Sequence, residues 1–279
     1  MKTALDAVVQ LSDWHIGTKV NLADNQFNLA IANARLTRYL NVSETIISEV
    51  LSPTTPVNTI HIMLLGDFIH NETMRGSAKA EAEFEFPDQE SHAADLILKC
   101  INFYAQLAPE VRCYGVVGNH GRAGRPGDNG LHSNHDYSVY NTVNKVLGPE
   151  HPACIQISRN KFVSANVCGG RKKVIGTHGD QVGGWGKRLP WAALTEMSYK
   201  AGLKYGGLDA MVFGHGHRGG VEQVSDYWLV CNPSLCGETS FTDDKCGGAQ
   251  AGQALFFMHP EHGQQHLNFV NLQCVQGDV

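Results

Sequence analysis

The sequence predicts an α/β protein that folds as one domain with two sheets. In the first half of the chain, strand-like and helix-like segments alternate, and each strand-like segment ends in a polar cluster. After residue 150 the pattern changes to a series of short strand-like segments. Across the 279 residues no linker rich in Pro, Ser or charge divides the two halves. We therefore expect a single domain that spans residues 1–279.

The first two elements are predicted from apolar spacing and from helix-breaking residues. Residues 8–11 are a short apolar run that leads into a polar loop, as a buried first strand would. Apolar side chains then recur at near-helical spacing over residues 23–51, with an interruption around residues 41–43. Pro53 and Pro56 end this predicted helix, because proline lacks the amide hydrogen that the helix needs.

The next segments continue the alternation. Residues 59–65 form the strongest predicted strand, since they are apolar enough on both faces to lie inside a parallel sheet. Residues 72–90 are acidic, rich in turn formers and poorly periodic, so we expect an inserted arm or lid there. A helix is predicted over residues 89–108 and a third strand over residues 111–117.

The remaining elements are a loop, a helix and several short strands. Residues 121–130 are rich in glycine and predict a loop, and a helix is expected over residues 135–147. The short strand-like segments that follow lie at residues 154–158, 161–167, 171–177, 210–213, 228–230, 253–258 and 266–272.

The composition excludes several classes of protein. With 42% hydrophobic and 18% charged residues, the chain matches neither a disordered nor a fibrous protein. A net charge of −5 argues against tight binding along a long stretch of duplex DNA, which needs many Lys and Arg contacts to phosphates. No apolar run approaches the roughly 18 residues of a membrane span, and Asp6 lies where a signal peptide needs apolar residues. We expect a cytoplasmic protein with no membrane partner.

The cysteines predict reduced thiols. The eight cysteines include no Cys-x-x-Cys pair, so their spacing matches neither a zinc ribbon nor a redox pair. Free cysteine is among the most buried residue types, and we expect these thiols to be mostly buried.

The 14 histidines of the chain are its most unusual feature. Five short clusters that follow strand-like runs hold most of the conspicuous polar residues. These clusters are Asp13-Trp14-His15, Gly66-Asp67, Gly118-Asn119-His120, His178-Gly179-Asp180 and Gly214-His215-Gly216-His217. Residues i and i+2 of an extended chain point to the same side, so a pair such as Asp13 and His15 can present two ligands to one cavity.

The order and spacing of these clusters resemble the calcineurin-like metallophosphoesterases. The motifs of that family run Asp-x-His, Gly-Asp, Gly-Asn-His, a single His and Gly-His-x-His, and the resemblance extends from Asp13 to His217. It implies a four-layer α/β/β/α sandwich of two mixed sheets flanked by helices. It also implies two metal sites that share Asp67, one formed by Asp13, His15, Asp67 and His217, the other by Asp67, Asn119, His178 and His215.

The donor types themselves indicate the class of metal. Imidazoles, carboxylates and one amide oxygen suit borderline divalent ions, whereas an all-oxygen set would suggest calcium or magnesium. We expect two divalent ions, manganese first, with zinc, iron or nickel as alternatives. Such ions bind phosphate oxygens and lower the pKa of water to about 7. The expected partner is therefore a phosphate-ester substrate, with DNA as one candidate; a homo-oligomer stays open.

His120 is the candidate general acid, because it lies next to Asn119 and is not among the ligands that the resemblance implies. Many members of the family have Asp or Glu directly after Gly-Asn-His, where this chain has Gly121. The carboxylate that would orient the histidine is therefore missing at that position. Asp128, Asp136 and Glu72 are the alternatives that the sequence offers.

Three further residues are candidates for substrate binding. The second motif of the family usually continues with Asp or Asn, where this chain has His70. This histidine either faces the substrate, supports a ligand or caps the strand end. Arg122 and Arg125 can clamp a phosphate through paired hydrogen bonds, with a solvated loop as the alternative. Tryptophans between residues 181 and 191 either stack on bases or pack into the core.

Three functions follow from this sequence. The first is a dimetal phosphodiesterase, in particular a DNA nuclease, because the runs around Asp13 and His120 look like the DNA-repair exonuclease branch of the family. The second is a phosphomonoesterase that acts on a phosphoprotein or a small nucleotide. The third is a non-catalytic binding scaffold. A narrow closed pocket over the metals would favour the second function, and an open basic groove would favour the first.

Overall fold

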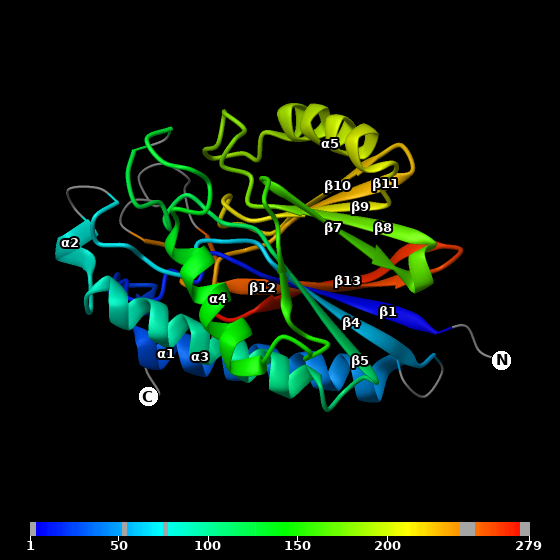
Figure 1. Ribbon diagram of the computed structural model, residues 1–279, viewed down its shortest axis with the longest axis horizontal. Helices are drawn as coiled ribbons and strands as arrows, with labels where there is room; N and C mark the ends of the chain where they lie inside the picture. The colour runs from blue at the N-terminus through cyan, green and yellow to red at the C-terminus, as the bar shows by residue number, and fades with distance from the viewer. Residues whose placement is uncertain (1–3, 52–54, 75–77, 126, 240–248, 274–279) are drawn as a thin grey trace.

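The computed structural model describes residues 4–51, 55–74, 78–125, 127–239 and 249–273. Two large sheets pack face to face, with helices on both outer faces (Figure 1). The predicted four-layer α/β/β/α sandwich is therefore confirmed. Within the described ranges, none of the helices has both the length and the hydrophobicity needed to cross a membrane.

The first sheet combines parallel strands from the first half of the chain with a C-terminal hairpin. Its strands β1, β4, β5 and β6 pair in parallel, and the hairpin β12–β13 adds to the free edge of β1 in antiparallel orientation. In spatial order the strands are β13 (Gly263–Asn271), β12 (Gly252–His259), β1 (Leu5–Leu11), β4 (Val57–Leu64), β5 (Glu110–Gly115) and β6 (Ile155–Ile157).

The second sheet has a parallel centre and antiparallel edges. Strand β9 lies between β11 and β8 and pairs with both in parallel, whereas β10 and β7 pair in antiparallel orientation at the two edges. The spatial order is β10 (Gly220–Val224), β11 (Tyr227–Cys231), β9 (Ala210–Phe213), β8 (Lys172–Thr177) and β7 (Phe162–Val167).

Three hydrophobic clusters hold the four layers together. Helices α1 (Leu29–Glu44), α3 (Phe86–Tyr104) and α4 (His135–Leu147) pack on the outer face of the first sheet. Helix α5 (Trp191–Tyr205) covers the outer face of the second sheet. A third cluster, which includes Val8, Met63, Val212 and Val230, fills the space between the sheets. Burial of these apolar faces is the main driving force for the arrangement.

Helix α1 begins later than the sequence predicts. The side chain of Asn28 accepts a hydrogen bond from the Ile31 amide at 2.9 Å and caps the helix. The preceding residues form the short hairpin β2 (Val20–Asn21) and β3 (Gln26–Phe27). No interruption occurs around residues 41–43; the backbone instead changes to a π-helix over Thr45–Leu51. Pro53 lies outside the described residues.

Other predicted boundaries also differ from the structure. Helix α3 begins at Phe86, so it contains the end of the predicted arm at residues 72–90. The described part of that segment includes the short helix α2 (Ala78–Glu81) and pairs with the loop after β1 through Lys19 N to Glu81 O, at 2.7 Å. Residues 75–77 lie outside the described ranges. The single domain and the bounds of the arm stay predictions.

The six cysteines that the structure describes are free, as the absence of paired spacing predicts. Five of them are buried and Cys154 is half-buried. Cys246 and Cys274 lie outside the described residues.

Candidate metal centre

The five polar clusters meet at one end of the two sheets. Strands β1, β4 and β5 are parallel neighbours, so their carboxyl ends bring Asp13, Asp67 and Asn119 to the same edge of the first sheet. Strands β8 and β9 do the same for His178 and His215 in the second sheet. Backbone hydrogen bonds from Asp13 N to Gly66 O and from Gly214 N to His178 O, at 3.0 and 3.1 Å, join neighbouring loops.

Several of these residues have a left-handed backbone, which is rare for residues other than glycine. The φ angles are 53°, 48°, 57°, 63° and 56° for Asp13, His15, Asp67, His215 and His217. Such conformations cost about 1–3 kcal/mol each and cluster at functional sites. These conformations occur where the side chains of several strand ends come together in one cluster.

The first group of donors contains Asp13, His15 and His217. The Nε2 atoms of His15 and His217 lie 3.1 Å apart, and His217 Nε2 is 3.5 Å from Asp13 Oδ1. The carboxylate of Asp13 is held by Ser12 Oγ at 2.5 Å and by the amide of His215 at 3.1 Å. The absence of a side chain at Gly214 is required, because a Cβ there would lie 2.4 Å from Asp13 Oδ2.

The second group centres on His178. Its Nε2 lies 3.1 Å from both Asn119 Oδ1 and Asp67 Oδ2, and 3.2 Å from His215 Nδ1. Its other ring nitrogen, Nδ1, is 2.8 Å from the carbonyl oxygen of Leu65 and donates to it. This second bond fixes the tautomer and turns Nε2 toward the other donors, as in many metal-binding histidines.

Asp67 belongs to both neighbourhoods. Its carboxylate forms one compact set of possible ligand atoms with His15 and His120 and another with His178 and His215, each with all atoms within 4.8 Å of one another. The structure thus brings together all seven residues that the sequence singles out as ligands: Asp13, His15, Asp67, Asn119, His178, His215 and His217.

Asp136 holds the loops that carry Asp67 and Asn119. Its buried carboxylate accepts three backbone hydrogen bonds, from Asp67, Phe68 and Gly118, at 2.9, 3.0 and 2.8 Å. Asp136 lies in the first turn of α4, whose N-cap is Asn134. The sequence offers Asp136 as a partner for His120, whereas the bonds in the structure assign it to the backbone of both loops.

His120 is oriented by a backbone carbonyl. Its Nδ1 lies 2.8 Å from the oxygen of His70, and its amide donates to Asp67 Oδ1 at 2.7 Å. The ring packs edge-on against His15, with centroids 4.5 Å apart. Of the other two candidate carboxylates, Glu72 accepts from Gln89 and Phe86, and Asp128 accepts from Arg125.

Burial sets the charge state of the imidazoles. It lowers the pKa of His215 to about 3 and that of His217 to about 4, and it lowers the pKa of His15 well below its usual value. Neighbouring positive charges, including His178 beside His215 and His120 beside His15, add to this effect. These three rings are therefore neutral, which is the form that binds metals.

The buried acids behave differently from one another. Burial, with a contribution from the charge of Asp67, raises the pKa of Asp13 to about 7. Burial alone would raise the pKa of Asp67, but the positive charges of His178 and His120 lower it well below the usual range. Conversely, the charge of Asp67 raises the pKa of His178 above its ordinary value although burial opposes this. Without a metal, Asp67 and His178 form a buried ion pair.

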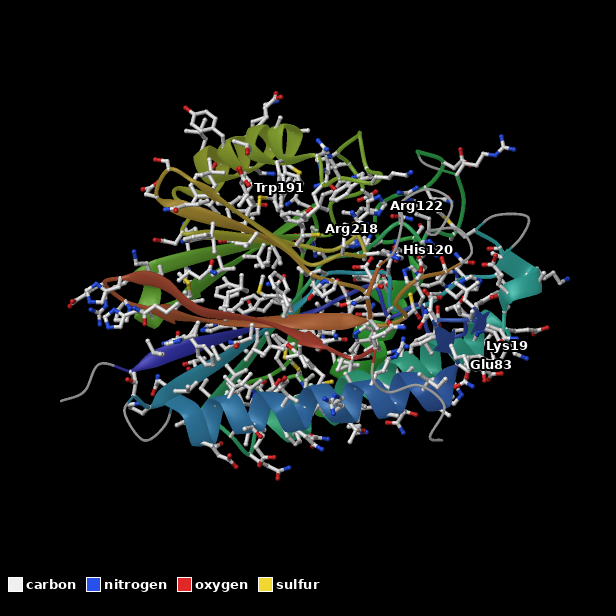
Figure 2. The ribbon with its side chains drawn as sticks, turned by 180° about the vertical axis from the view of Figure 1, so that it is seen from behind. Lys19, Glu83, His120, Arg122, Trp191 and Arg218 are labelled. Atoms are coloured by element: carbon white, nitrogen blue, oxygen red, sulfur yellow. The ribbon has the colours of Figure 1, made fainter. Side chains whose placement is uncertain are left out.

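The three candidate substrate-binding residues lie in different settings. His70 is buried, with Nε2 3.0 Å from the carbonyl oxygen of Ala78. Arg122 pairs with Asp180 through Nη2 and Oδ2 at 2.6 Å, and Figure 2 shows it near His120. Arg125 is exposed in the glycine-rich loop.

The tryptophans after His178 pack into the second sheet. Trp185 contacts the ring of His215 edge-on, with centroids 5.1 Å apart, and Trp191 does the same with Phe213 at 6.2 Å. Both belong to the cluster under α5. This placement matches the core alternative rather than a surface that stacks on bases.

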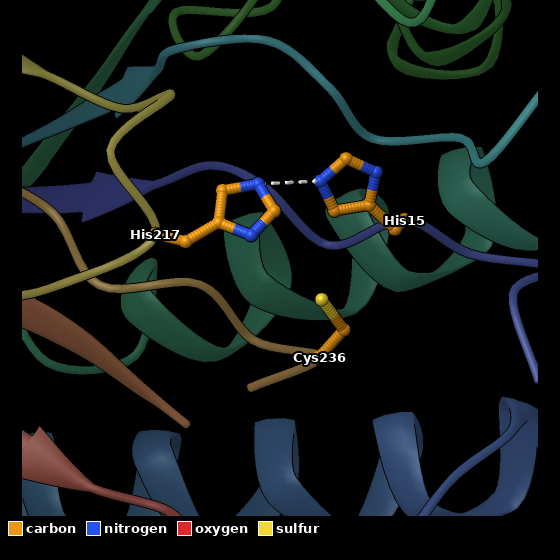
Figure 3. A group of neighbouring side chains, drawn as sticks. All are labelled: His15, His217 and Cys236. Carbon is orange, nitrogen blue, oxygen red and sulfur yellow. Dashed lines mark hydrogen bonds between the residues drawn. The ribbon is translucent and has the colours of Figure 1, made fainter. Parts of the chain in front are cut away.

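Cys236 is a potential donor that the sequence analysis missed. Its sulfur forms a compact set with His15 and His217, with all ligand atoms within 4.8 Å, and Figure 3 shows the thiol below the two rings. Burial raises the pKa of this thiol to about 12. His217 Nδ1, on the side facing Cys236 in Figure 3, is buried and has no hydrogen-bond partner among the described residues. The spacing of the cysteines gave no signal for this contact.

Comparisons with known proteins give matches to solved structures alone. No family profile and no curated protein matches the sequence. A vacuolar protein sorting 29 from Cryptosporidium parvum matches at 14% identity and a TM-score of 0.45, covering 96% of this chain and 99% of the other. A structure described as a novel archaeal phosphodiesterase matches at 12% identity and a TM-score of 0.41, covering 95% and 98%.

A third match is a conserved uncharacterized protein of Streptococcus pneumoniae TIGR4 described as a predicted phosphoesterase. It has 12% identity and a TM-score of 0.37, and the alignment covers 96% of this chain and 98% of the other.

Proposed function

We propose that this chain, which has the fold and the motif order of the calcineurin-like metallophosphoesterases, is a metal-dependent phosphodiesterase and in particular a DNA nuclease of the exonuclease type. The observation that carries the proposal is the pair of compact donor groups that share Asp67, one with His15 and His120 and the other with His178 and His215. Such a pair is suited to two cations side by side, and pairs of divalent ions serve phosphate transfer in phosphatases, polymerases and nucleases.

The donors fit divalent metal ions. The first site would consist of Asp13, His15, Asp67 and His217, and the second of Asp67, Asn119, His178 and His215. Three observations support this fit: His15 and His217 direct their Nε2 atoms at each other, burial keeps three rings neutral, and the Leu65 carbonyl holds His178 in the ligand tautomer. We propose manganese, with zinc, iron and nickel as alternatives.

Bound divalent ions would polarise the phosphate and make water a nucleophile near neutral pH. The protein's own part in the reaction is to hold the donors fixed and to supply a proton to the leaving oxygen. Asp136 fulfils the first role, because its three backbone bonds fix the loops of Asp67 and Asn119.

We assign the proton transfer to His120. The bond from Nδ1 to the His70 carbonyl leaves Nε2 as the atom that can deliver a proton to the substrate. The ring lies at the edge of the donor cluster, beside His15, and is only partly buried. His70 therefore contributes through its backbone, and its own ring is engaged by Ala78. Arg122 and Arg125, on the next loop, are proposed to bind phosphate groups of the substrate.

The test uses the purified protein with Mn²⁺ and three substrates: a labelled DNA strand, bis-para-nitrophenyl phosphate and para-nitrophenyl phosphate. We expect hydrolysis of both diesters, with slower turnover of the monoester. Brisk monoester turnover without diester hydrolysis would identify a phosphomonoesterase instead. Bound metal with no turnover of any substrate would identify a scaffold.

A further inference from the structure

A cavity of about 510 Å³ opens beside the metal-ligand cluster. It lies between the loop that follows β5 and the start of β7, and its lining includes Gly118, Arg122, Arg125, Lys161 and Asp180. Gly118 directly precedes Asn119, and a Cβ on Gly118 would lie 2.1 Å from Asp67 Oδ1. Asp180, also in the lining, comes two residues after His178, so a molecule in this cavity would lie next to the proposed metal ligands.

The charge of the cavity is opposite in sign to that of the whole protein. Three cations and one carboxylate line it, whereas the chain carries a net charge of −5. Asp180 Oδ2 accepts from Arg122 at 2.6 Å and lies 3.5 Å from Lys161 Nζ. One carboxylate oxygen thus faces two cations, and Arg125 adds a third. This excess of positive charge would attract an anion.

The cavity is held in shape by hydrogen bonds on both sides of the loop. Asn134 Nδ2 donates to the carbonyl of Gly118 at 2.9 Å, and Ala123 N donates to Ser133 O at 3.2 Å. The amide of His135, at the start of α4, donates to Gly121 O at 2.6 Å. Arg122 itself is fixed by Asp180. A preorganised donor such as Arg122 loses less freedom when a ligand binds, which lowers the entropic cost of binding.

We propose that this cavity binds a second phosphate group of the substrate, on the nucleotide next to the bond that is cleaved. This inference rests on the proposed phosphodiesterase function and narrows its substrate class to short oligonucleotides with a terminal phosphate. The volume lies within the range of ligand pockets, about 300–1,000 Å³. A guanidinium fork matches phosphate better than it matches a neutral sugar or base, and the lysine adds a flexible point charge.

The experiment compares three thymidine dinucleotides: unphosphorylated, 5′-phosphorylated and 3′-phosphorylated. With Mn²⁺ we expect the KM of one phosphorylated form to be about tenfold lower than that of the unphosphorylated form, as one additional charge-assisted hydrogen bond would give. A preference for either end supports the proposal and identifies the side on which the cavity lies. Equal KM values for all three overturn it.

Variants connect the preference to the cavity. Arg125→Ala and Lys161→Ala should each reduce the tenfold preference, and the double variant should bring it to within about twofold. Lys145→Ala, an exposed residue of α4 that is not in the lining, removes the same charge and should keep the full preference. A preference that survives in the double variant contradicts the proposal.

Failure of the proposed function and failure of this inference give different results. If wild-type protein does not hydrolyse bis-para-nitrophenyl phosphate, the proposed function fails. In that case, calorimetry can measure the equilibrium binding of the same three dinucleotides to the metal-free protein. This measurement still tests whether the cavity binds a phosphate. Tighter binding of one phosphorylated form that is lost in the double variant supports the inference, and equal binding of all three forms refutes it.

Discussion

The two sheets contribute different chemistry to the same site. The loops of the first sheet carry both proposed carboxylate ligands, Asp13 and Asp67, together with Asn119 and His120. The proposed ligands on the loops of the second sheet are all imidazoles, from His178, His215 and His217. The two sheets pack against each other through the hydrophobic cluster between them. In the proposed metal centre, the first sheet would supply the negative charge, and the second would supply donors that burial keeps mostly neutral.

The supporting contacts differ in the same way. The first-sheet loops are fixed by a buried carboxylate, since Asp136 binds three of their amides. The second-sheet loops are held by contacts with the first sheet, including His178 Nδ1 to Leu65 O and the amide of His215 to Asp13. Disturbing the first sheet should therefore affect both proposed metal sites, whereas a change in the second sheet should affect one.

The largest effect is expected from Asp67→Asn. The variant removes one charge that both donor groups share, so we expect metal content to fall from two equivalents to less than one, with loss of diester hydrolysis. His217→Ala removes a second-sheet ligand of the first group alone and should retain about one equivalent. Elemental analysis after dialysis measures both. Two full equivalents in the Asp67 variant would show that the shared ligand is wrongly assigned.

His120→Ala should lower turnover without removing metal. Loss of a general acid typically reduces the rate about 10²-fold or more, and His120 is not among the proposed ligands. The rate with bis-para-nitrophenyl phosphate and the metal content should be measured on the same sample. His151→Ala, which lies beyond α4, is the matched control and should keep the wild-type rate. Unchanged turnover in the His120 variant would assign the acid to another group.

Asp136→Asn tests whether the first sheet depends on its anchoring carboxylate. An amide nitrogen would replace one acceptor oxygen and leave at least one of the three backbone amides unpaired. We expect the free energy of unfolding of the metal-free protein to fall by about 2 kcal/mol, measured by urea denaturation. Asp128→Asn, on an exposed loop where the carboxylate accepts one bond from Arg125, should change it by less than about 0.5 kcal/mol. If both variants lowered the free energy of unfolding equally, Asp136 would not be the residue that anchors these loops.

Much of the fold could be predicted because it depends on local patterns. The apolar runs gave the central strands to within a few residues, and the helix at 135–147 coincides with α4. Helix α5 was missed, since the glycines and tryptophans before it resemble a loop; its signal is the apolar spacing of Leu194, Met197 and Ala201 with Gly206 at the C-cap. Strand β10 was missed because its residues are mostly exposed and carry no apolar alternation.

The donor set could also be predicted, because ligands are specified by residue type and by their position after a strand. Their role as ligands stays a prediction. The contacts around them could not be predicted. His120 is oriented by the carbonyl of His70, and a carbonyl is present at every residue, so no sequence signal marks it. Likewise, Asp136 acts on Asp67 from 69 positions away, and Cys236 approaches His15 only through the fold.

The smallest expected effect is the pH dependence of metal affinity, which separates the carboxylates of the first sheet from the imidazoles of the second. Burial raises the pKa of Asp13 to about 7, so a metal ion must displace a proton from it below that pH. His215 and His217, with pKa values of about 3 and 4, are already neutral throughout this range.

Metal affinity should fall as pH falls, because the protonated carboxyl group of Asp13 does not bind a metal ion. As pH falls from 7 to 6, the affinity for Mn²⁺ of the proposed site that contains Asp13 should decrease by up to about tenfold, the limit for one displaced proton. Calorimetric titration in two buffers with different ionisation enthalpies would count the protons released. Asp13→Asn, which cannot titrate, should bind Mn²⁺ more weakly and lose this part of the pH dependence. If the affinity of that variant still falls with pH, the group that releases the proton is His178 instead. His178 is the second-sheet imidazole whose pKa is raised by its surroundings.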